Sequence, residues 1–192
     1  MEVVQYPHPA LRYKSKPITQ IDANLRSIVA EMFELMYSHR GIGLAANQVG
    51  LPWRLFIINP TGDSENKDDE FVFINPEISD RKGSEEAEEG CLSLPEVYGD
   101  VRRPEKIVVK AFGLDGQGFQ MELEDLPARV VQHETDHVDG VMFFDRMTET
   151  AARELKPKLD DFESLFRKQQ ESGKYESDKE LANELDRLAA QM

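Results

Sequence analysis

Apolar residues recur at helical spacing in the segment that follows Asp22. They are Leu25, Ile28, Val29, Met32, Phe33 and Met36. A stripe with this period predicts an amphipathic helix whose apolar face belongs to the core. Asp22 is a typical N-cap and Gly41 a typical stop signal, so we expect the helix to span residues 23–40.

Four further segments have the apolar pattern of β-strands: residues 54–59, 70–75, 105–112 and 118–124. The last two flank Asp115-Gly116, a dipeptide that favours a tight turn, so they predict a hairpin.

A second helix is predicted from Asp125, a potential N-cap, to about Asp139, with Gly140 as its stop. Val130 and Val131 are interleaved with polar residues there, so part of this helix must be buried. We therefore expect an α+β fold in which antiparallel sheets surround this central helix and the first helix packs alongside.

Residues 149–192 are rich in Leu, Ala, Glu and Lys, which predicts a C-terminal helical extension. Pro157 and Ser172-Gly173 are expected to interrupt it. The preceding residues 1–148 are long enough for one domain with its own core, and we expect the catalytic chemistry there.

The chain of 192 residues has a net charge of −14, and more than half of this excess lies between residues 63 and 89. We interpret that stretch as solvated loop flanking strands. Direct nucleic-acid binding is not expected, because it depends on Lys and Arg. The single cysteine, Cys91, excludes an intrachain disulfide, and no apolar stretch reaches the length of about 20 residues that spans a bilayer. We expect a cytoplasmic protein without a membrane segment.

The predicted second helix contains His133-Glu134-Thr135-Asp136-His137. Residues four apart lie on one helix face, so both imidazoles can reach one ion. Glu134 is rotated from His133 by about 100° around the axis and can lie beside the ion without being a ligand. Two nitrogen ligands next to a free carboxylate are typical of metallohydrolases.

A catalytic metal usually has three protein ligands and one open position. Cys91 is the best candidate for the third ligand, because Gly90 before it permits a close backbone approach. Asp139 and Asp145 remain rivals. The pattern alone also allows a zinc metallopeptidase or a non-catalytic metal-binding module, although a structural site normally needs four protein ligands.

Three segments in this order and spacing resemble the signature motifs of the peptide deformylase family. They are residues 41–50 (GIGLAANQVG), 89–93 (EGCLS) and 132–140 (QHETDHVDG). The resemblance covers roughly residues 4 to 148. It implies an enzyme that removes the formyl group from the N-terminal formylmethionine of nascent polypeptides and releases formate.

The resemblance implies that Cys91, His133 and His137 hold the metal, with water at the fourth position. The usual ion in the family is Fe(II), and Zn, Ni or Co can replace it. Glu134 is then the group that takes a proton from the attacking water and later delivers it to the leaving amine.

By the same resemblance, the side chain of Gln48 and the backbone N–H of Leu92 stabilise the developing oxyanion. The expected substrate-binding residues are Ile42, Gly43, Gly90 and Val130. The two glycines would let a peptide lie close to the backbone, and the two apolar residues would line the methionine pocket.

Glu89 is expected to pair with Arg103 and so to brace the cysteine loop. His8, His39 and Trp53 are expected to be packing or surface residues. The chain departs from the family pattern at Asn47, where many members have Thr.

It departs again at residues 96–98 (EVY), where some members have an arginine beside the substrate cleft, and this leaves contacts beyond the first substrate residue open. In some members a C-terminal tail docks on the ribosome. An acidic tail is poorly suited to bind ribosomal RNA, so transient ribosome association is kept here as a hypothesis.

Overall fold

The computed structural model describes residues 1–191. Its strands are β1 Gly43–Ala45, β2 Leu55–Ile58, β3 Phe71–Lys82, β4 Glu85–Cys91, β5 Leu94–Arg103, β6 Lys106–Phe112 and β7 Gly118–Glu124. Its longer helices are α1 Ala23–Ser38, α2 Asp125–Val138, α3 Glu149–Glu171 and α4 Asp178–Ala189. Short 3-10 helices occupy Pro9–Arg12, Ala46–Val49, Lys67–Asp69 and Phe143–Arg146.

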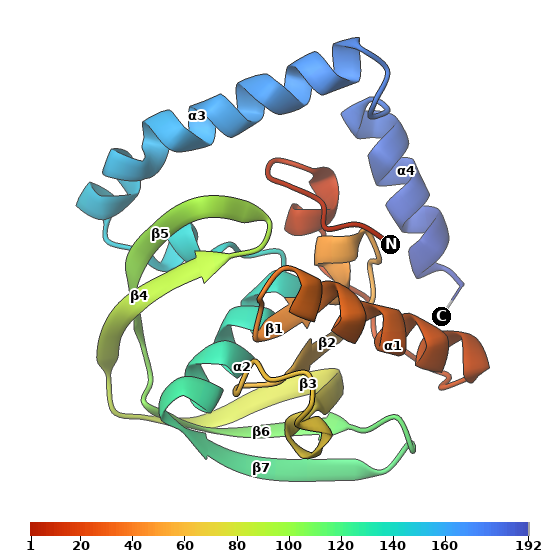
Figure 1. The fold of residues 1–192 in the computed structure, drawn as a ribbon, viewed down its shortest axis with the longest axis vertical. Helices are drawn as coiled ribbons and strands as arrows, with labels where there is room; N and C mark the ends of the chain where they lie inside the picture. The colour runs from red at the N-terminus through yellow and green to blue at the C-terminus, as the bar shows by residue number, and fades with distance from the viewer. Residues whose placement is uncertain (192) are drawn as a thin grey trace.

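Two antiparallel sheets enclose α2, as Figure 1 shows. The larger sheet has the strand order β1-β2-β3-β6-β7, and β4 and β5 form a separate hairpin on the other side. The expected α+β fold with a central helix is therefore confirmed. So are all four predicted strands and the turn at Asp115-Gly116, where Gly116 has a φ of +79°.

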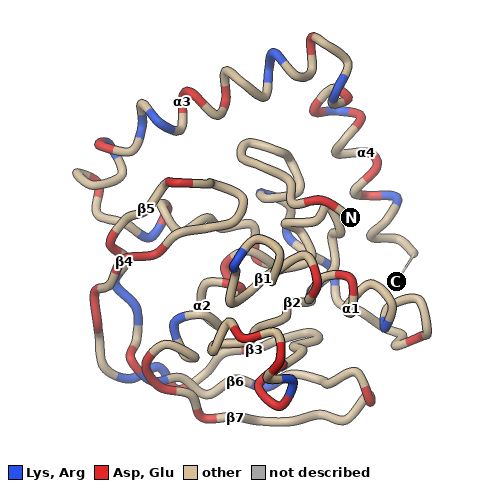
Figure 2. The backbone as a smooth tube through the Cα atoms, in the orientation of Figure 1, with Lys and Arg blue, Asp and Glu red and all other residues tan. Residues whose placement is uncertain are grey.

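The interpretation of the acidic stretch as loop was wrong beyond residue 75. β3 continues to Lys82, and β4 begins at Glu85 and pairs with β5. Figure 2 shows acidic residues along β4. One face of these strands is exposed to solvent, so charged side chains hide the apolar alternation that reveals a strand.

Two details of the helices also differ from the expectation: the N-cap of α2 and the continuity of α3. Helix α2 has Glu124 at its N-cap without a side-chain hydrogen bond, and Asp125, the expected cap, is its first residue. Pro157 does not interrupt α3, because a continuous apolar face holds both halves of that helix against the protein. The break at residues 172–173 is confirmed, with Gly173 at a φ of +78°.

Three clusters of buried side chains hold the helices and the two sheets together. Helix α1 packs Leu25 and Met32 with Leu44 of β1 and Leu55 of β2, on the face of the sheet opposite to α2. Helix α2 packs Val131 against the sheet, where Phe56 and Phe73 stack with ring centroids 4.8 Å apart.

The β4–β5 hairpin is supported from behind by the C-terminal extension. Val97 and Val101 of β5 pack with Phe143, and Leu155 and Phe162 of α3 belong to the same cluster. Figure 1 shows α3 crossing over this hairpin before the chain turns into α4. The apolar face of α3 is thus used within the molecule.

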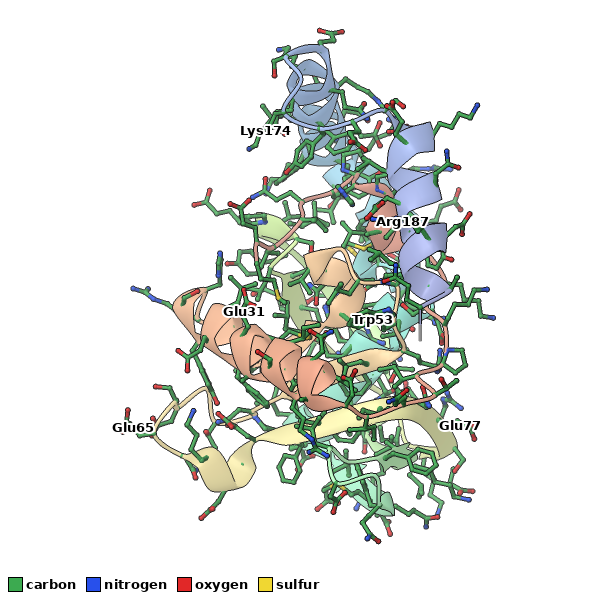
Figure 3. All side chains as sticks on the ribbon, turned by 90° about the vertical axis from the view of Figure 1, so that its right-hand side faces the viewer. Glu31, Trp53, Glu65, Glu77, Lys174 and Arg187 are labelled. Atoms are coloured by element: carbon green, nitrogen blue, oxygen red, sulfur yellow. The ribbon has the colours of Figure 1, made fainter. Side chains whose placement is uncertain are left out.

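Helix α4 returns to the N-terminal segment. Asp186 accepts a hydrogen bond from the hydroxyl of Tyr13 at 2.9 Å, and the carbonyl of Leu188 accepts one from the indole of Trp53 at 3.4 Å. Figure 3 shows Trp53 beneath the helix that carries Arg187. No helix within residues 1–191 is long and apolar enough to cross a membrane.

His8 connects the N-terminal segment to this extension. Its Nδ1 accepts a hydrogen bond from the backbone N–H of Ala10, and its ring packs edge-on against Phe166 and Tyr175. Burial lowers the pKa of His8 to about 4, although the carboxylate of Asp178 acts in the opposite direction. The expected packing role of His8 is confirmed, as are the burial of Trp53 and the exposure of His39.

The depressed pKa of His8 predicts a loss of stability in mild acid. The unfolded chain binds a proton near pH 6.5 and the folded chain only near pH 4, so this contribution is complete above pH 6.5 and falls as the pH drops toward 4. Between pH 7 and pH 5 we expect the free energy of unfolding to fall by about 2 kcal/mol more in the natural chain than in the variant His8→Gln. Urea titrations at both pH values measure this difference, and equal losses in the two proteins would refute it.

Candidate active site

Three potential metal ligands meet at the centre of the molecule. Helix α2 presents His133 and His137 one turn apart, with 3.1 Å between their Nε2 atoms. Cys91, at the end of β4, places its Sγ 3.3 Å from Nε2 of His137. The ligand atoms of all three residues lie within 4.8 Å of one another.

The two rival ligands lie elsewhere. Asp139 pairs with Arg54 at 2.5 Å, and Asp145 pairs with Arg12. The fold therefore brings together the expected set of Cys91, His133 and His137. The cysteine comes from β4 and both histidines come from α2.

The donor chemistry of this group fits a divalent transition metal. Nδ1 of His133 lies 2.9 Å from Oε2 of Glu89, and a proton on Nδ1 leaves the lone pair of Nε2 facing Cys91 and His137. One thiolate and two imidazole nitrogens form a set that accepts several transition metals. A metal held by these three donors would keep a fourth position for water or substrate, as in catalytic sites.

Glu89 is the centre of a buried ion network behind the ligands. Its carboxylate accepts two hydrogen bonds from Arg103, at 2.6 and 2.9 Å, and one from Arg129 at 2.8 Å. Burial alone would raise the pKa of Glu89, but the hydrogen bonds from His133 and Arg103 outweigh it and lower the pKa to about 2. The expected Glu89–Arg103 pair is thus confirmed.

Sequence reasoning missed the other members of this network. Arg129 comes from the same helix as the histidines, and Asp136 joins Arg103 at 2.8 Å and the exposed Arg146 at 2.6 Å. Their positions on α2, four residues before His133 and three after it, place both on the side of the helix near His133 and could have indicated them.

Glu134 lies buried beside the ligand group. Within residues 1–191 its Oε2 has no hydrogen-bond partner. Burial raises the pKa of Glu134 to about 7, although the neighbouring His133 acts against this. A carboxyl group with a pKa near neutrality can both accept and donate a proton, as a general acid–base group must.

Gly43 has a role that the sequence did not reveal. A Cβ atom at this position would lie 2.5 Å from Oε1 of Glu134. The missing side chain therefore makes room for the carboxylate of Glu134, in addition to any closeness that it allows to a peptide.

The variant Gly43→Ala is accordingly expected to displace the Glu134 carboxylate and to lower kcat by about a hundredfold, while the metal content stays the same. Gly118→Ala is the matched control, because its new Cβ would meet only the ring of Phe112 at an ordinary 3.5 Å. Metal analysis and steady-state kinetics of both variants test this, and a Gly43→Ala enzyme with normal kcat would contradict it.

Gln48 points its amide group toward the ligands. Its Oε1 accepts a hydrogen bond from the backbone N–H of Ala45 at 2.8 Å, which fixes the amide orientation. Its Nε2 then lies 3.4 Å from Sγ of Cys91 and 3.4 Å from Oγ of Ser93.

The N–H of Leu92, in the turn between β4 and β5, has no partner among the loop and turn hydrogen bonds of residues 1–191. Two donors are therefore available beside the open metal position.

A cleft of about 560 Å³ leads from the surface to this group. The expected catalytic, substrate-binding and metal-binding residues all lie along it except His137: Ile42, Gly43, Gln48, Gly90, Cys91, Leu92, Val130, His133 and Glu134. Leu126, Glu88 and Tyr98, which sequence reasoning did not select, line the same cleft.

Comparisons with known proteins agree with this geometry. A family model described as polypeptide deformylase matches residues 1–153. The chain belongs to this family. The peptide deformylase of Rhodopirellula baltica is 44% identical over 184 residues, which cover 96% of this chain and 91% of that protein. The chloroplastic peptide deformylase 1B of Solanum lycopersicum is 45% identical over 83% of this chain and 57% of its own length.

Solved deformylase structures share the fold. Peptide deformylase 1B of Arabidopsis thaliana, in complex with an inhibitor, has a TM-score of 0.83 and 41% identity over 91% of this chain and 95% of that chain. The enzyme of Plasmodium falciparum has a TM-score of 0.83 and 34% identity over 86% and 97% of the two chains.

Membership of the deformylase family decides between the three functions that the metal-ligand pattern alone allowed. The chain is a hydrolase of the peptide deformylase type, which removes the formyl group from the N-terminal formylmethionine of polypeptides. A zinc metallopeptidase and a purely structural metal module are set aside. The family and the Cys91, His133 and His137 group together indicate a metal ion in this deformylase.

Proposed function

We propose that Cys91, His133 and His137 hold one divalent ion and that this ion is Fe(II), with Zn, Ni or Co as possible substitutes. The observation that carries the proposal is the convergence of their three ligand atoms within 4.8 Å beside the buried carboxylate of Glu134. A divalent ion in such a site acts as a Lewis acid and lowers the pKa of coordinated water to about 7.

Glu134 is the proton carrier in this proposal. It takes a proton from the water that attacks the formyl carbon and delivers it to the amine of the departing methionine. Its burial beside the ligands and its pKa of about 7 suit both steps. The amide of Gln48 and the N–H of Leu92 donate to the formyl oxygen as negative charge develops on it. Two observations support this: Nε2 of Gln48 already lies beside Cys91, and Leu92 lines the cleft with an N–H that is free of loop and turn hydrogen bonds within residues 1–191.

The methionine side chain of the substrate is assigned to the apolar part of the cleft at Ile42 and Val130. Gly43 and Gly90 border the path of the peptide backbone. An extended peptide can lie here like an added strand, because β4 pairs only with β5 and β1 only with β2 among the described strands.

We further propose that residues 1–148 form the catalytic part and residues 149–192 an extension that supports it from behind. A cytoplasmic location stays a prediction, since the relatives include a chloroplastic enzyme. Transient ribosome association also stays a prediction. Leu155 and Phe166 of α3 are buried within the molecule, so a ribosome contact would have to use the exposed side of that helix, which is mostly charged.

The decisive experiment is an anaerobic assay of formate release from a formyl-Met peptide, with an acetyl-Met peptide as the control. The protein is loaded separately with Fe(II), Ni, Co and Zn, and the metal that co-purifies is measured. Formate release that is fastest with Fe(II), and absent for the acetyl peptide, is expected. Higher turnover with another ion would overturn the assignment of iron, and no release with any ion would overturn the roles proposed for the site.

A further inference from the structure

The mouth of the cleft has two walls that carry charged side chains. Glu88 of β4 and Glu96 of β5 lie on the hairpin wall, and Arg40 lies on the opposite wall just after α1. All three line the cleft and are exposed. Because their side chains are exposed to solvent, unlike the buried histidines of the ligand group, they are placed to meet the part of a peptide that follows its first residue.

These three charges are free. Within residues 1–191, none of them takes part in an ion pair or a side-chain hydrogen bond, whereas Glu86 and Glu89 on the same strand are paired with arginines. A free charge at a binding surface keeps its full field for an incoming ligand. The hairpin wall therefore presents two negative charges against one positive charge on the other wall.

An aromatic surface lies between the two acids. Tyr98 is 57% exposed, and a Cβ atom built at its cross-strand neighbour Gly90 would lie 2.8 Å from its ring. The ring thus lies over Gly90, at the edge of the cleft. The face of an aromatic ring attracts a cation, and the aliphatic stem of a long basic side chain packs well on it.

From these residues we infer that the enzyme prefers nascent chains with Lys or Arg in the two positions that follow formylmethionine. The inference rests on the proposed function, which places the formyl end at Cys91 and Glu134. An extended peptide that leaves this point rises about 3.3 Å per residue. Its second and third residues therefore pass the wall that Glu88, Glu96 and Tyr98 form.

A panel of amidated peptides of the form formyl-Met-Xaa-Xaa tests the preference, with Lys, Gln or Glu at the second or third position. The C-terminal amide removes a carboxylate that Arg40 would otherwise attract. At low ionic strength we expect kcat/KM to fall in the order Lys, Gln, Glu, with about a fivefold spread between Lys and Glu. The spread should lie in KM, because the rim contacts are the same in the ground state and the transition state. High salt should reduce it.

Variants then assign the preference to the wall. The double variant Glu88→Gln, Glu96→Gln is expected to lose most of the spread in kcat/KM between the Lys and Glu peptides. The control Glu154→Gln removes the same type of charge from an exposed position on α3 that does not line the cleft, and should keep the full spread. Tyr98→Leu should weaken binding of the Lys peptides more than of the Gln peptides.

Formate release from the Gln peptides shows that the site removes the formyl group, independently of the preference. If they are processed but the Lys and Glu peptides have equal kcat/KM, the preference is wrong. A preference for Glu would show that Arg40 dominates the rim and would also overturn it. A spread that survives in the double variant would remove Glu88 and Glu96 from the explanation and refute the inference as stated.

Discussion

The variant Glu134→Gln is expected to lower kcat by about a thousandfold while the protein keeps its metal. The change preserves the size of the side chain but removes the group that accepts and returns the proton, a contribution of about 10²–10⁴ in typical enzymes. Glu134 is not needed to hold the ion, because the converging atoms belong to Cys91, His133 and His137. The measurement is formate release under anaerobic conditions together with the metal content of the purified variant.

Glu124→Gln is the matched control for this variant. Glu124 directly precedes α2 and is exposed, and its ion pair with Lys106 is exposed on both sides. Loss of such a pair has little effect on folding or turnover. A Glu134→Gln enzyme that retains more than about a tenth of the normal kcat would show that another group carries the proton. Loss of the metal in this variant would instead make Glu134 part of the ligand set.

The part of the site that lies on one helix could be predicted from the sequence. His133, Glu134 and His137 are local neighbours, and the period of a helix alone places the two imidazoles on one face. Cys91 was the best candidate for the third ligand because of Gly90, but a lone cysteine is more often a buried apolar residue. Only the resemblance separated it from Asp139 and Asp145. The pair of Glu89 and Arg103 was likewise inferred from the motif and not from spacing.

Features that depend on long-range packing escaped prediction. The hairpin that carries Cys91 was not predicted, since its solvent-facing side is acidic and glutamate is a poor strand former. The fit of Glu134 into the space left by Gly43 joins β1 to α2, and no local pattern records that contact. The same holds for Tyr98, whose place over Gly90 follows from strand register.

Glu89→Gln is expected to destabilise the protein by about 3–5 kcal/mol and to weaken metal binding by about 10–100-fold. Glu89 and Arg103 are both almost fully buried, and a neutral amide leaves the positive charges of Arg103 and Arg129 without their shared partner. Breaking one member of a buried ion network has this effect because the remaining charge stays desolvated. A neutral amide has one acceptor oxygen where the carboxylate has two, so Nδ1 of His133 must compete with the arginines for it. The ring of His133 is then held less firmly, which weakens a ligand without removing it.

Urea unfolding and competition for the metal by a chelator measure the two effects separately. Glu86→Gln is the matched control, since Glu86 lies on the same strand but forms an exposed pair with Arg102 and should change the free energy of unfolding by less than about 1 kcal/mol. Because Glu89 binds both arginines and also Nδ1 of His133, the losses of stability and of metal affinity should appear together. A Glu89→Gln protein that loses stability but binds the metal normally would show that Glu89 holds only the fold. It would also show that the position of His133 is set by α2 alone.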